Sequence, residues 1–476
     1  MVTSTVLPIA AASGTVVMSS ATYWVLRMYG FGVRYWRLNG VDARRAHRDA
    51  AYIRRSYKQL FYLIGLYLKD KRPTRAPSNG AGATPQVRIR YPKLKSITSD
   101  DYGVVADFKL VPKVTLKSFQ DSAEDFANYW QMVRVNTIQT EPNRVRVRAV
   151  RKDPLLAKTI AVLPEKTPQL DSFPAGVDDF GDLVDLRVRN GSGFGVFGLP
   201  RYGKTSLILG LITYFAPNPS IVFLIADGKS TTGHEGDYLD VAPRALSVIG
   251  NDLQTFNTWI KQIELIRRMR AATMRQARGV RNFWDAGPTP EWPLIMPIID
   301  ECHNFFDIIP SAGNPEMQYR NSIAADNAHV VADITRMGAG VGIIPVLSTQ
   351  KSTGDGIPTM IRDNLHSRIC FAVSTDEVSF AALGKGIRQF PDANPINYQH
   401  EDFVGVATMR ASNRTGYVRV RTPLYRDQVA AAVCERYAHL VRPESCPGIT
   451  AGTEHRAIMS AEDASGLLNI VDFDKD

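Results

Sequence analysis

The sequence predicts an α/β protein with a parallel central sheet, preceded by a small α+β module and a basic N-terminal region. From about residue 153 onward, short apolar segments alternate with long helical stretches, which is typical of a parallel sheet. Residues 88–152 instead show strand-like alternation, interrupted by one helical stretch. Residues 1–95 hold 17 lysines and arginines against three aspartates. We therefore expect two differently built folded parts behind a strongly basic segment.

These changes of pattern divide the 476 residues into five segments. Apolar residues make up 44% of the chain and charged residues 22%, as in an ordinary globular protein. The four cysteines lie at no metal-binding spacing and suggest no disulfide framework, which fits a reducing compartment. The expected segments are a basic N-terminal region (1–75), a Gly- and Pro-containing linker (76–87), the α+β module (88–152), the α/β domain (153–425) and a helical and acidic C-terminal tail (426–476).

An uncharged segment near the start of the chain is a candidate membrane span. Residues 5–26 carry no charge and have about the length that crosses a bilayer. Tyr23 and Trp24 close the segment and Arg27 begins the basic tract, an order that places the following residues in the cytosol. We expect the basic region to lie beside a polyanion, either phospholipid head groups or nucleic acid. A solvated surface without such a partner is the alternative.

A phosphate-binding loop is the most specific motif of the chain. An apolar strand leads into it and an apolar helix leaves it, as such a loop requires. Backbone N–H groups would hold the phosphates, the lysine would meet the β/γ charge and the threonine hydroxyl would ligate Mg²⁺. Bulky residues at the fourth and fifth positions fit only if they point outward. The motif consists of Gly198, Leu199, Pro200, Arg201, Tyr202, Gly203, Lys204 and Thr205.

Polar residues end two later apolar segments. Residues 294–300 form an expected strand that ends in Asp300 and is followed by Glu301. Behind a phosphate-binding loop, Asp300 would hold Mg²⁺ through water and Glu301 would deprotonate the attacking water. Pro297 cannot donate a ladder hydrogen bond, so on one side we expect pairing only from about Ile298. The next expected strand ends at Gln350, which could sense the γ-phosphate. The alternatives are an acidic pair that caps a helix and a glutamine that caps a turn.

Together, these motifs resemble the FtsK/SpoIIIE motor family, and within it the plasmid-transfer (Tra) branch. Four motifs occur in the family's order: GLPRYGKTS at 198–206, ADGK at 226–229, IIDE at 298–301, and LSTQKS with IRDNLHSRICFAVS between 347 and 374. The resemblance covers about 90–425. It implies a RecA-like P-loop ATPase motor that uses ATP and Mg²⁺, forms homo-oligomeric rings, as a hexamer, and translocates double-stranded DNA. With the candidate membrane span at 5–26 and the basic tract after it, we expect a bacterial cytoplasmic location, at the inner face of the cell membrane.

The resemblance also implies roles for single residues. Lys204, Thr205, Asp300, Glu301 and Gln350 fall on the family's nucleotide site. Arg368 matches a basic position of the family that could reach the γ-phosphate bound by a neighbouring subunit. The alternative is that Arg368 is a buried or helix-capping arginine. Three positions depart from the family pattern. Gly228 replaces the usual proline, Ala339 stands where a basic residue is usual, and Lys351 stands where arginine is usual.

Other functions remain open at this point. The letters Asp300-Glu301-Cys302-His303 spell the DECH box of some helicases, but too little sequence follows for the second RecA-like domain that those enzymes need. A secretion ATPase of the same superfamily, moving a protein substrate, is a second alternative. A scaffold that binds nucleotide without hydrolysis is a third, and the intact Lys204, Asp300 and Glu301 argue against it.

Overall fold

The structure of the protein is a computed structural model. Its fold contains two units, Met1–Pro154 and Leu155–Asp476. In the part of the chain described, no helix is long and apolar enough to cross a membrane. The predicted membrane segment at 5–26 and most of the predicted linker at 76–87 lie outside that part. The described residues are 35–38, 40–72, 86–233, 235–351, 356–410, 416–446 and 449.

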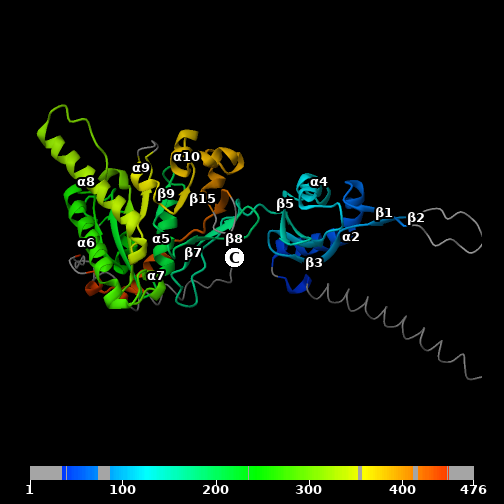
Figure 1. Cartoon of the computed structure of the whole chain (residues 1–476), viewed down its shortest axis with the longest axis horizontal. Coiled ribbons are helices and arrows are strands. Elements are labelled where there is room, and N and C mark those ends of the chain that lie inside the picture. Colours follow the sequence, from blue (N-terminus) through cyan, green and yellow to red (C-terminus); the bar gives the residue numbers. More distant parts are fainter. Residues whose placement is uncertain are drawn as a thin grey trace, which may run out of the picture. The chain divides into compact units, whose positions relative to one another are not determined.

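The N-terminal unit is a small α+β fold. A ribbon of β1 and β2 stands beside an antiparallel sheet of order β3-β4-β6-β5. Helices α2, α3 and α4 contact the strands of this sheet (Figure 1). Its elements are α2 (Val41–Leu63), β1 (Leu68–Arg72), β2 (Gln86–Arg90), β3 (Lys93–Ser99), β4 (Gly103–Lys109), α3 (Leu116–Asp121), α4 (Ala123–Trp130), β5 (Arg134–Glu141) and β6 (Arg144–Val150).

The long helix α2 belongs to this unit, although the sequence placed it in a separate basic region. Its apolar residues recur at helical spacing, and Ile53, Leu60 and Phe61 are buried in one core with Phe108 of β4 and Trp130 of α4. Phe61 and Phe108 have ring centroids 5.2 Å apart. Burial of one helical stripe leaves the basic residues of α2 on its outer side. The folded unit therefore begins well before residue 88.

The C-terminal unit is an α/β fold around one large sheet. The P-loop motif lies between its first parallel strand, β9, and helix α5. Its elements are β7 (Ser172–Asp178), β8 (Leu183–Arg187), β9 (Phe194–Phe197), α5 (Lys204–Phe215), β10 (Ile221–Asp227), β11 (Ala245–Ile249), α6 (Leu253–Arg278), α7 (Phe283–Ala286), β12 (Leu294–Asp300), α8 (Pro315–Met337), β13 (Val346–Thr349), α9 (Thr359–Arg362), β14 (Ser367–Cys370), α10 (Asp376–Leu383), β15 (Val406–Met409), β16 (Val418–Arg421) and α11 (Asp427–Arg436).

The ten strands lie in the order β11-β10-β12-β13-β9-β14-β15-β16-β7-β8. Neighbours from β11 to β14 are parallel, and those from β14 to β8 are antiparallel. Helix α5 leads from β9 to β10 in one direction along the sheet, whereas α6 and α8 lead to β12 and β13 in the other direction. Because such crossovers are right-handed as a rule, α5 is expected on one face and α6 and α8 on the other. Figure 1 shows α6 and α8 side by side, and they contact each other. The predicted fold class, a P-loop α/β domain with a parallel central sheet, is confirmed.

The central strands are buried on both faces. Every residue of β10 and β12 is buried, as expected for strands between two helix layers. Pro297 pairs with Leu224 of β10, whereas the ladder to β13 covers only Ile298 and Ile299. The prediction that β12 pairs from about Ile298 on one side is therefore confirmed, and an isolated bridge joins Ile295 to Ile343 below it.

Helix α11, the last α-helix among the described residues, is part of the same fold. Ala430, Val433 and Cys434 are buried in the core of the C-terminal unit. The Tyr425 ring lies so close to Gly210 of α5 that a Cβ there would stand 2.4 Å from it. The α/β unit therefore extends past residue 425, where the sequence placed the beginning of a tail.

Candidate nucleotide site

The phosphate-binding loop bends sharply between β9 and α5. Gly198 and Gly203 have φ values of 140° and 113°, which favour glycine. A Cβ on Gly198 would also lie 2.8 Å from the Cβ of Phe371. The Leu199 N–H donates to the carbonyl oxygen of Ala372 at 2.8 Å, which ties the loop to the end of β14. The loop is thus held at the carboxyl edge of the parallel strands, where α/β sheets bind ligands.

The two bulky loop residues behave differently. Arg201 adopts φ 67° and is exposed, so it points outward as predicted. Tyr202 is half-buried, and its hydroxyl donates to the carbonyl oxygen of Gln399 at 2.5 Å. The Gly405 N–H in turn donates to the Tyr202 carbonyl oxygen. Tyr202 therefore does not point away from the protein but fastens the loop to the segment before β15.

Lys204 is the buried cation of the site. Its side chain is 4% exposed, and its Nζ donates to the carbonyl oxygens of Gly198 and Leu199 at 2.8 and 2.9 Å. Burial lowers the pKa of Lys204 to about 8, although Glu301 and Asp300 act in the opposite direction. The ammonium is thus poorly compensated within the protein, which suits a group that meets the phosphate charge of a ligand.

The acidic pair stands at the carboxyl end of β12. Asp300 is 1% exposed and Glu301 is 4% exposed, and Glu301 adopts a left-handed backbone with φ 45°. The Glu301 Oε2 accepts the Gln350 N–H at 3.1 Å and lies 3.3 Å from His303 Nδ1. Burial alone would raise the pKa of Glu301, but His303, the Gln350 N–H and Lys229 outweigh it and lower that pKa. Glu301 is therefore held as a carboxylate, as a general base requires.

A second lysine lies against this pair. Lys229, which follows β10, places its Nζ 3.3 Å from Asp300 Oδ2, 3.1 Å from Asp237 Oδ2 and 3.9 Å from Glu301 Oε1. Burial would lower the pKa of Lys229, but Asp300 and Asp237 raise it above its usual range. Lys229 therefore supplies a positive charge directly beside the carboxylates.

The backbone before Lys229 explains the glycine at position 228. The Gly228 N–H donates to the Asp300 carbonyl oxygen at 3.0 Å. A Cβ at this position would lie 2.7 Å from that same oxygen and 2.8 Å from the Glu301 carbonyl oxygen. A proline here would remove the donor and crowd both carbonyls. Gly228 thus lets the lysine-bearing turn approach the acidic pair closely.

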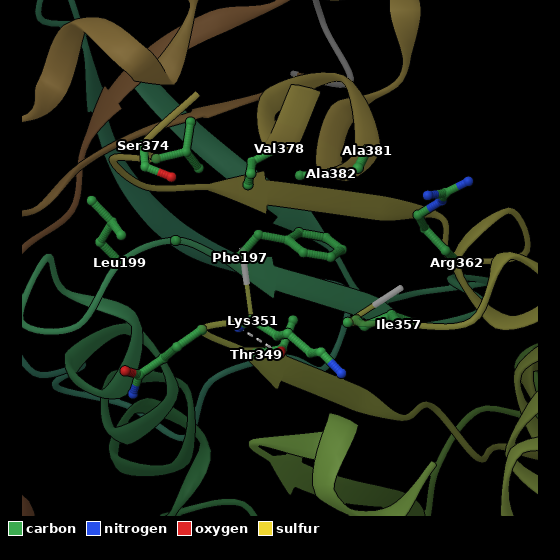
Figure 2. A pocket seen from close by; sticks show the side chains of 14 residues that line it. Phe197, Leu199, Thr349, Lys351, Ile357, Arg362, Ser374, Val378, Ala381 and Ala382 are labelled. Atoms are coloured by element: carbon green, nitrogen blue, oxygen red, sulfur yellow. Dashed lines mark hydrogen bonds between the residues drawn. The ribbon is translucent and has the colours of Figure 1, made fainter. Parts of the chain in front are cut away.

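The predicted γ-phosphate sensor, Gln350, lies at the end of β13. Because β13 is inserted between β9 and β12, Gln350 comes beside both the loop and the acidic pair. Figure 2 shows the small pocket here, between the ends of β9, β13 and β14, with Thr349 and Lys351 on its wall. The main-chain N–H of Gln350 binds Glu301, and its half-buried side chain lines the pocket.

His303 is a residue of this site that sequence reasoning assigned only to a helicase-like letter pattern. Its Nδ1 lies 3.1 Å from the Thr349 hydroxyl and 3.3 Å from Glu301 Oε2. It therefore connects the end of β13 to the carboxylate and fixes the Glu301 rotamer. In the sequence, the feature that could have indicated this contact is that His303 lies two residues after Glu301.

Arg368 lies elsewhere on the same chain. It stands on β14, is partly buried and contacts Asp363 at 3.7 Å. Burial lowers its pKa. It lines a surface hollow with Arg362 and Lys385, whereas the pocket beside the P-loop is lined by Arg362 and not by Arg368. Within one chain Arg368 therefore does not line the pocket beside the P-loop, which Gln350 lines.

No family model matches this chain. The DNA translocase FtsK of Staphylococcus aureus (strain Mu50 / ATCC 700699) is 24% identical over 328 residues, 61% of this chain and 39% of the relative. This chain is similar to FtsK. The predicted resemblance to FtsK is thereby confirmed, while the chain spans about two fifths of the length of the curated FtsK relatives it matches.

Two solved structures are among those similar to this chain. The pCW3 conjugation coupling protein TcpA, in a monomer form with ATPgS, is 14% identical, with 71% of this chain and 90% of that chain covered and a TM-score of 0.47. The cytoplasmic domain of the type VII secretion ATPase EccC from Thermomonospora curvata is 17% identical, with 60% and 33% covered and a TM-score of 0.44. The FtsK similarity and the loop geometry agree with the predicted class, a P-loop ATPase.

Proposed function

We propose that this chain is an ATP-driven motor that translocates double-stranded DNA, in plasmid or mobile-element transfer. The observation that carries the proposal is the assembly of Lys204, Asp300, Glu301 and Gln350 at one sheet edge, in a chain similar to FtsK. FtsK of S. aureus is a DNA translocase. The order of motifs resembles the plasmid-transfer branch, which supports mobile DNA as the cargo.

The residues present fit ATP with Mg²⁺. Glu301 Oε1 is buried without a hydrogen-bond partner among the described residues, and Asp300 offers a second buried carboxylate. Such oxygens, with the Thr205 hydroxyl, suit a hard cation that keeps several waters. Thr205 and Asp300 would hold Mg²⁺, which would neutralise phosphate charge when bound. Glu301 accepts the proton of the water that attacks the γ-phosphorus, and the bond to the ADP oxygen breaks as the new one forms.

In a ring of subunits, Arg368 would act on the nucleotide of a neighbouring subunit, a role that it cannot have within a single chain. Its hollow holds three basic side chains, Arg362, Arg368 and Lys385, against one carboxylate, Asp363. In a homo-hexamer this surface would face the nucleotide of the neighbouring subunit. Mixing Arg368→Ala with Glu301→Gln chains tests this arrangement, because interfaces with an intact Glu301 and a neighbouring intact Arg368 should regain activity. Mixtures that stay as inactive as either variant would show that Arg368 does not act across an interface.

The central test is ATP hydrolysis by the full chain with and without linear duplex DNA. Strong stimulation by duplex, absent in Lys204→Ala, is the expected result. A rate that is indifferent to duplex but rises with a protein substrate would support the secretion-ATPase alternative instead. Strand separation without translocation would support the helicase-like alternative.

Attachment to the inner face of the cell membrane is part of the proposal. It rests on the uncharged segment at 5–26 followed by the basic tract. Expression of the full chain followed by alkaline carbonate extraction of membranes is the test. Complete release into the supernatant would remove the membrane from the proposed function without affecting the motor.

A further inference from the structure

The four-stranded sheet of the N-terminal unit has one covered face and one open face. Phe108, Val145 and Val147 point to the covered face, where they pack in one core with α2 and α4. Side chains alternate along a strand, so the neighbours of these residues point to the other face. Lys109 and Arg144 are such neighbours, and both are exposed. The open face therefore presents long basic side chains to solvent.

Three of these basic residues stand directly opposite one another. Lys93 of β3 pairs with Lys109 of β4, and Lys109 pairs with Arg144 of β6. Like charges at directly opposite positions destabilise a sheet. Arg144 also contacts Glu141 at 3.2 Å, whereas neither lysine has an ion-pair partner in the part of the chain that the structure describes. This row has an electrostatic cost that a bound polyanion would offset.

On the rest of the open face, carboxylates balance the charge of the arginines. In the next row, Arg146 makes a bidentate contact with Asp107 at 2.8 and 3.2 Å. Beyond it, Arg148 is only 6% exposed and contacts Asp100 at 2.7 Å, so this end of the face does not offer a basic side chain to solvent. The excess positive charge is thus concentrated at the end of the sheet that holds the row of three. Residues 1–154 as a whole carry 26 lysines and arginines against 11 aspartates and glutamates, a net charge of +15.

The exposed aromatic and aliphatic side chains that would favour binding to a lipid bilayer lie on a different surface. Tyr52, Tyr62 and Leu63 are exposed on α2, which covers the opposite face of the sheet. On the open face, Ile138 is an exposed large hydrophobic residue amid polar neighbours. A flat array of cations fixed by strand pairing, with little apolar surface, favours a rigid and uniformly charged partner over a bilayer.

We propose that the open face of the β3-β4-β6-β5 sheet docks the phosphate backbone of double-stranded DNA, with Lys93, Lys109 and Arg144 as the contacting row. The choice of duplex rests on the proposed function. The unit would then hold the cargo outside the ATPase fold, through contacts that carry no sequence information. Such contacts release counterions from the duplex, so binding through them weakens steeply with salt.

The test compares two triple variants of the full chain that remove the same charge. The sheet variant is Lys93→Gln, Lys109→Gln and Arg144→Gln. The matched control is Arg45→Gln, Arg48→Gln and Arg55→Gln, which removes three exposed cations from α2. Binding of a fluorescent 30-base-pair duplex is measured by anisotropy without nucleotide over a range of NaCl concentrations. The plot of log K against log salt has a negative slope. In the sheet variant the magnitude of this slope should fall by about 2 to 3, at about 0.9 for each lost phosphate contact.

Several results would overturn the proposal. Equal losses in both variants would mean that only net charge matters, and an unchanged slope in the sheet variant would mean that this face makes no phosphate contact. Loss of binding to phosphatidylserine vesicles, with duplex binding intact, would assign the face to the membrane. Matching melting temperatures exclude misfolding as the cause. Duplex-stimulated ATP hydrolysis of the wild type is measured in parallel, so that failure of the motor function and failure of this surface remain distinguishable.

Discussion

Replacement of Lys229 by methionine isolates the charge balance of the acidic site. Lys229 lies 3.3 Å from Asp300, 3.1 Å from Asp237 and 3.9 Å from Glu301. Asp300 and Glu301 are almost fully buried, so they depend on nearby cations for compensation. Methionine keeps the length of the stem and removes the ammonium. The variant should therefore leave two buried carboxylates undercompensated, with only Lys204 nearby.

The magnitude follows from the separations and the burial. At an effective dielectric constant of about 20, a pair of charges about 3.3 to 3.9 Å apart attracts by roughly 4 to 5 kcal/mol before desolvation. Removal of one partner of a buried ion pair costs about 3 to 5 kcal/mol. The Lys229 side chain is 34% exposed, and solvent screening reduces this figure. We expect a loss of about 2 kcal/mol in the free energy of unfolding, or a melting temperature lower by about 4 °C.

The assay is thermal unfolding of Lys229→Met in EDTA and in about 10 mM MgCl₂. A divalent cation would take the position of the missing charge, so Mg²⁺ should restore about 1 kcal/mol or more of the free energy of unfolding of the variant. A Mg²⁺ concentration about tenfold above its dissociation constant gives a stabilisation of this size. Lys351→Met is the control, because Lys351 is 32% exposed and pairs with Asp307, outside the acidic pair. Equal destabilisation of both variants without any effect of Mg²⁺ would refute the reasoning.

Three further predictions concern the same unit. Glu301→Gln should retain ATP binding and slow single-turnover hydrolysis by about 10² to 10⁴, and an unchanged rate would exclude Glu301 as the base. Burial lowers the pKa of Lys204 to about 8, so the nucleotide-free protein loses this cation as the pH rises through that value. Calorimetry should therefore show weaker ATP binding at pH 9 than at pH 7, and equal affinities would contradict the assignment. Alanine favours helices by about 1 kcal/mol over glycine. Gly210→Ala should nevertheless destabilise the protein in urea titrations by about 1 to 3 kcal/mol, because its Cβ would meet the Tyr425 ring, and a gain in stability would show that the ring moves freely.

The features that the sequence predicted are those that depend on short local patterns. The P-loop requires glycine at positions where the backbone adopts positive φ, so Gly198 and Gly203 identify it without any tertiary information. The strand that ends in Asp300 is an apolar run, because helices cover both faces of the sheet. Even the interrupted pairing at Pro297 follows from a property of one residue, its missing N–H.

Features that depend on long-range contacts escaped prediction. The antiparallel strands β15 and β16 are four residues each, too short for a periodic signal, and they extend the sheet by pairing with β14 and β7. Helix α2 reads as a basic segment because only its buried stripe is apolar. Tyr202 fastens the loop to a segment almost 200 residues away, a contact that no local pattern encodes.

The charge distribution of the chain suggests a division of labour between its two units. Residues 155–476 carry 31 lysines and arginines against 36 acidic residues, a net charge of −5, whereas residues 1–154 carry +15. Residues 450–476 account for −4 of this −5, so the ATPase fold before them is nearly neutral. A DNA motor of the proposed kind must release and rebind its track during each cycle, and a nearly neutral fold favours weak contacts to phosphate. A separate basic sheet can hold the same track continuously without slowing that cycle. If the proposed function holds, removal of the row of Lys93, Lys109 and Arg144 should shorten the time for which the chain stays bound to duplex DNA more than it changes the rate of ATP hydrolysis while bound.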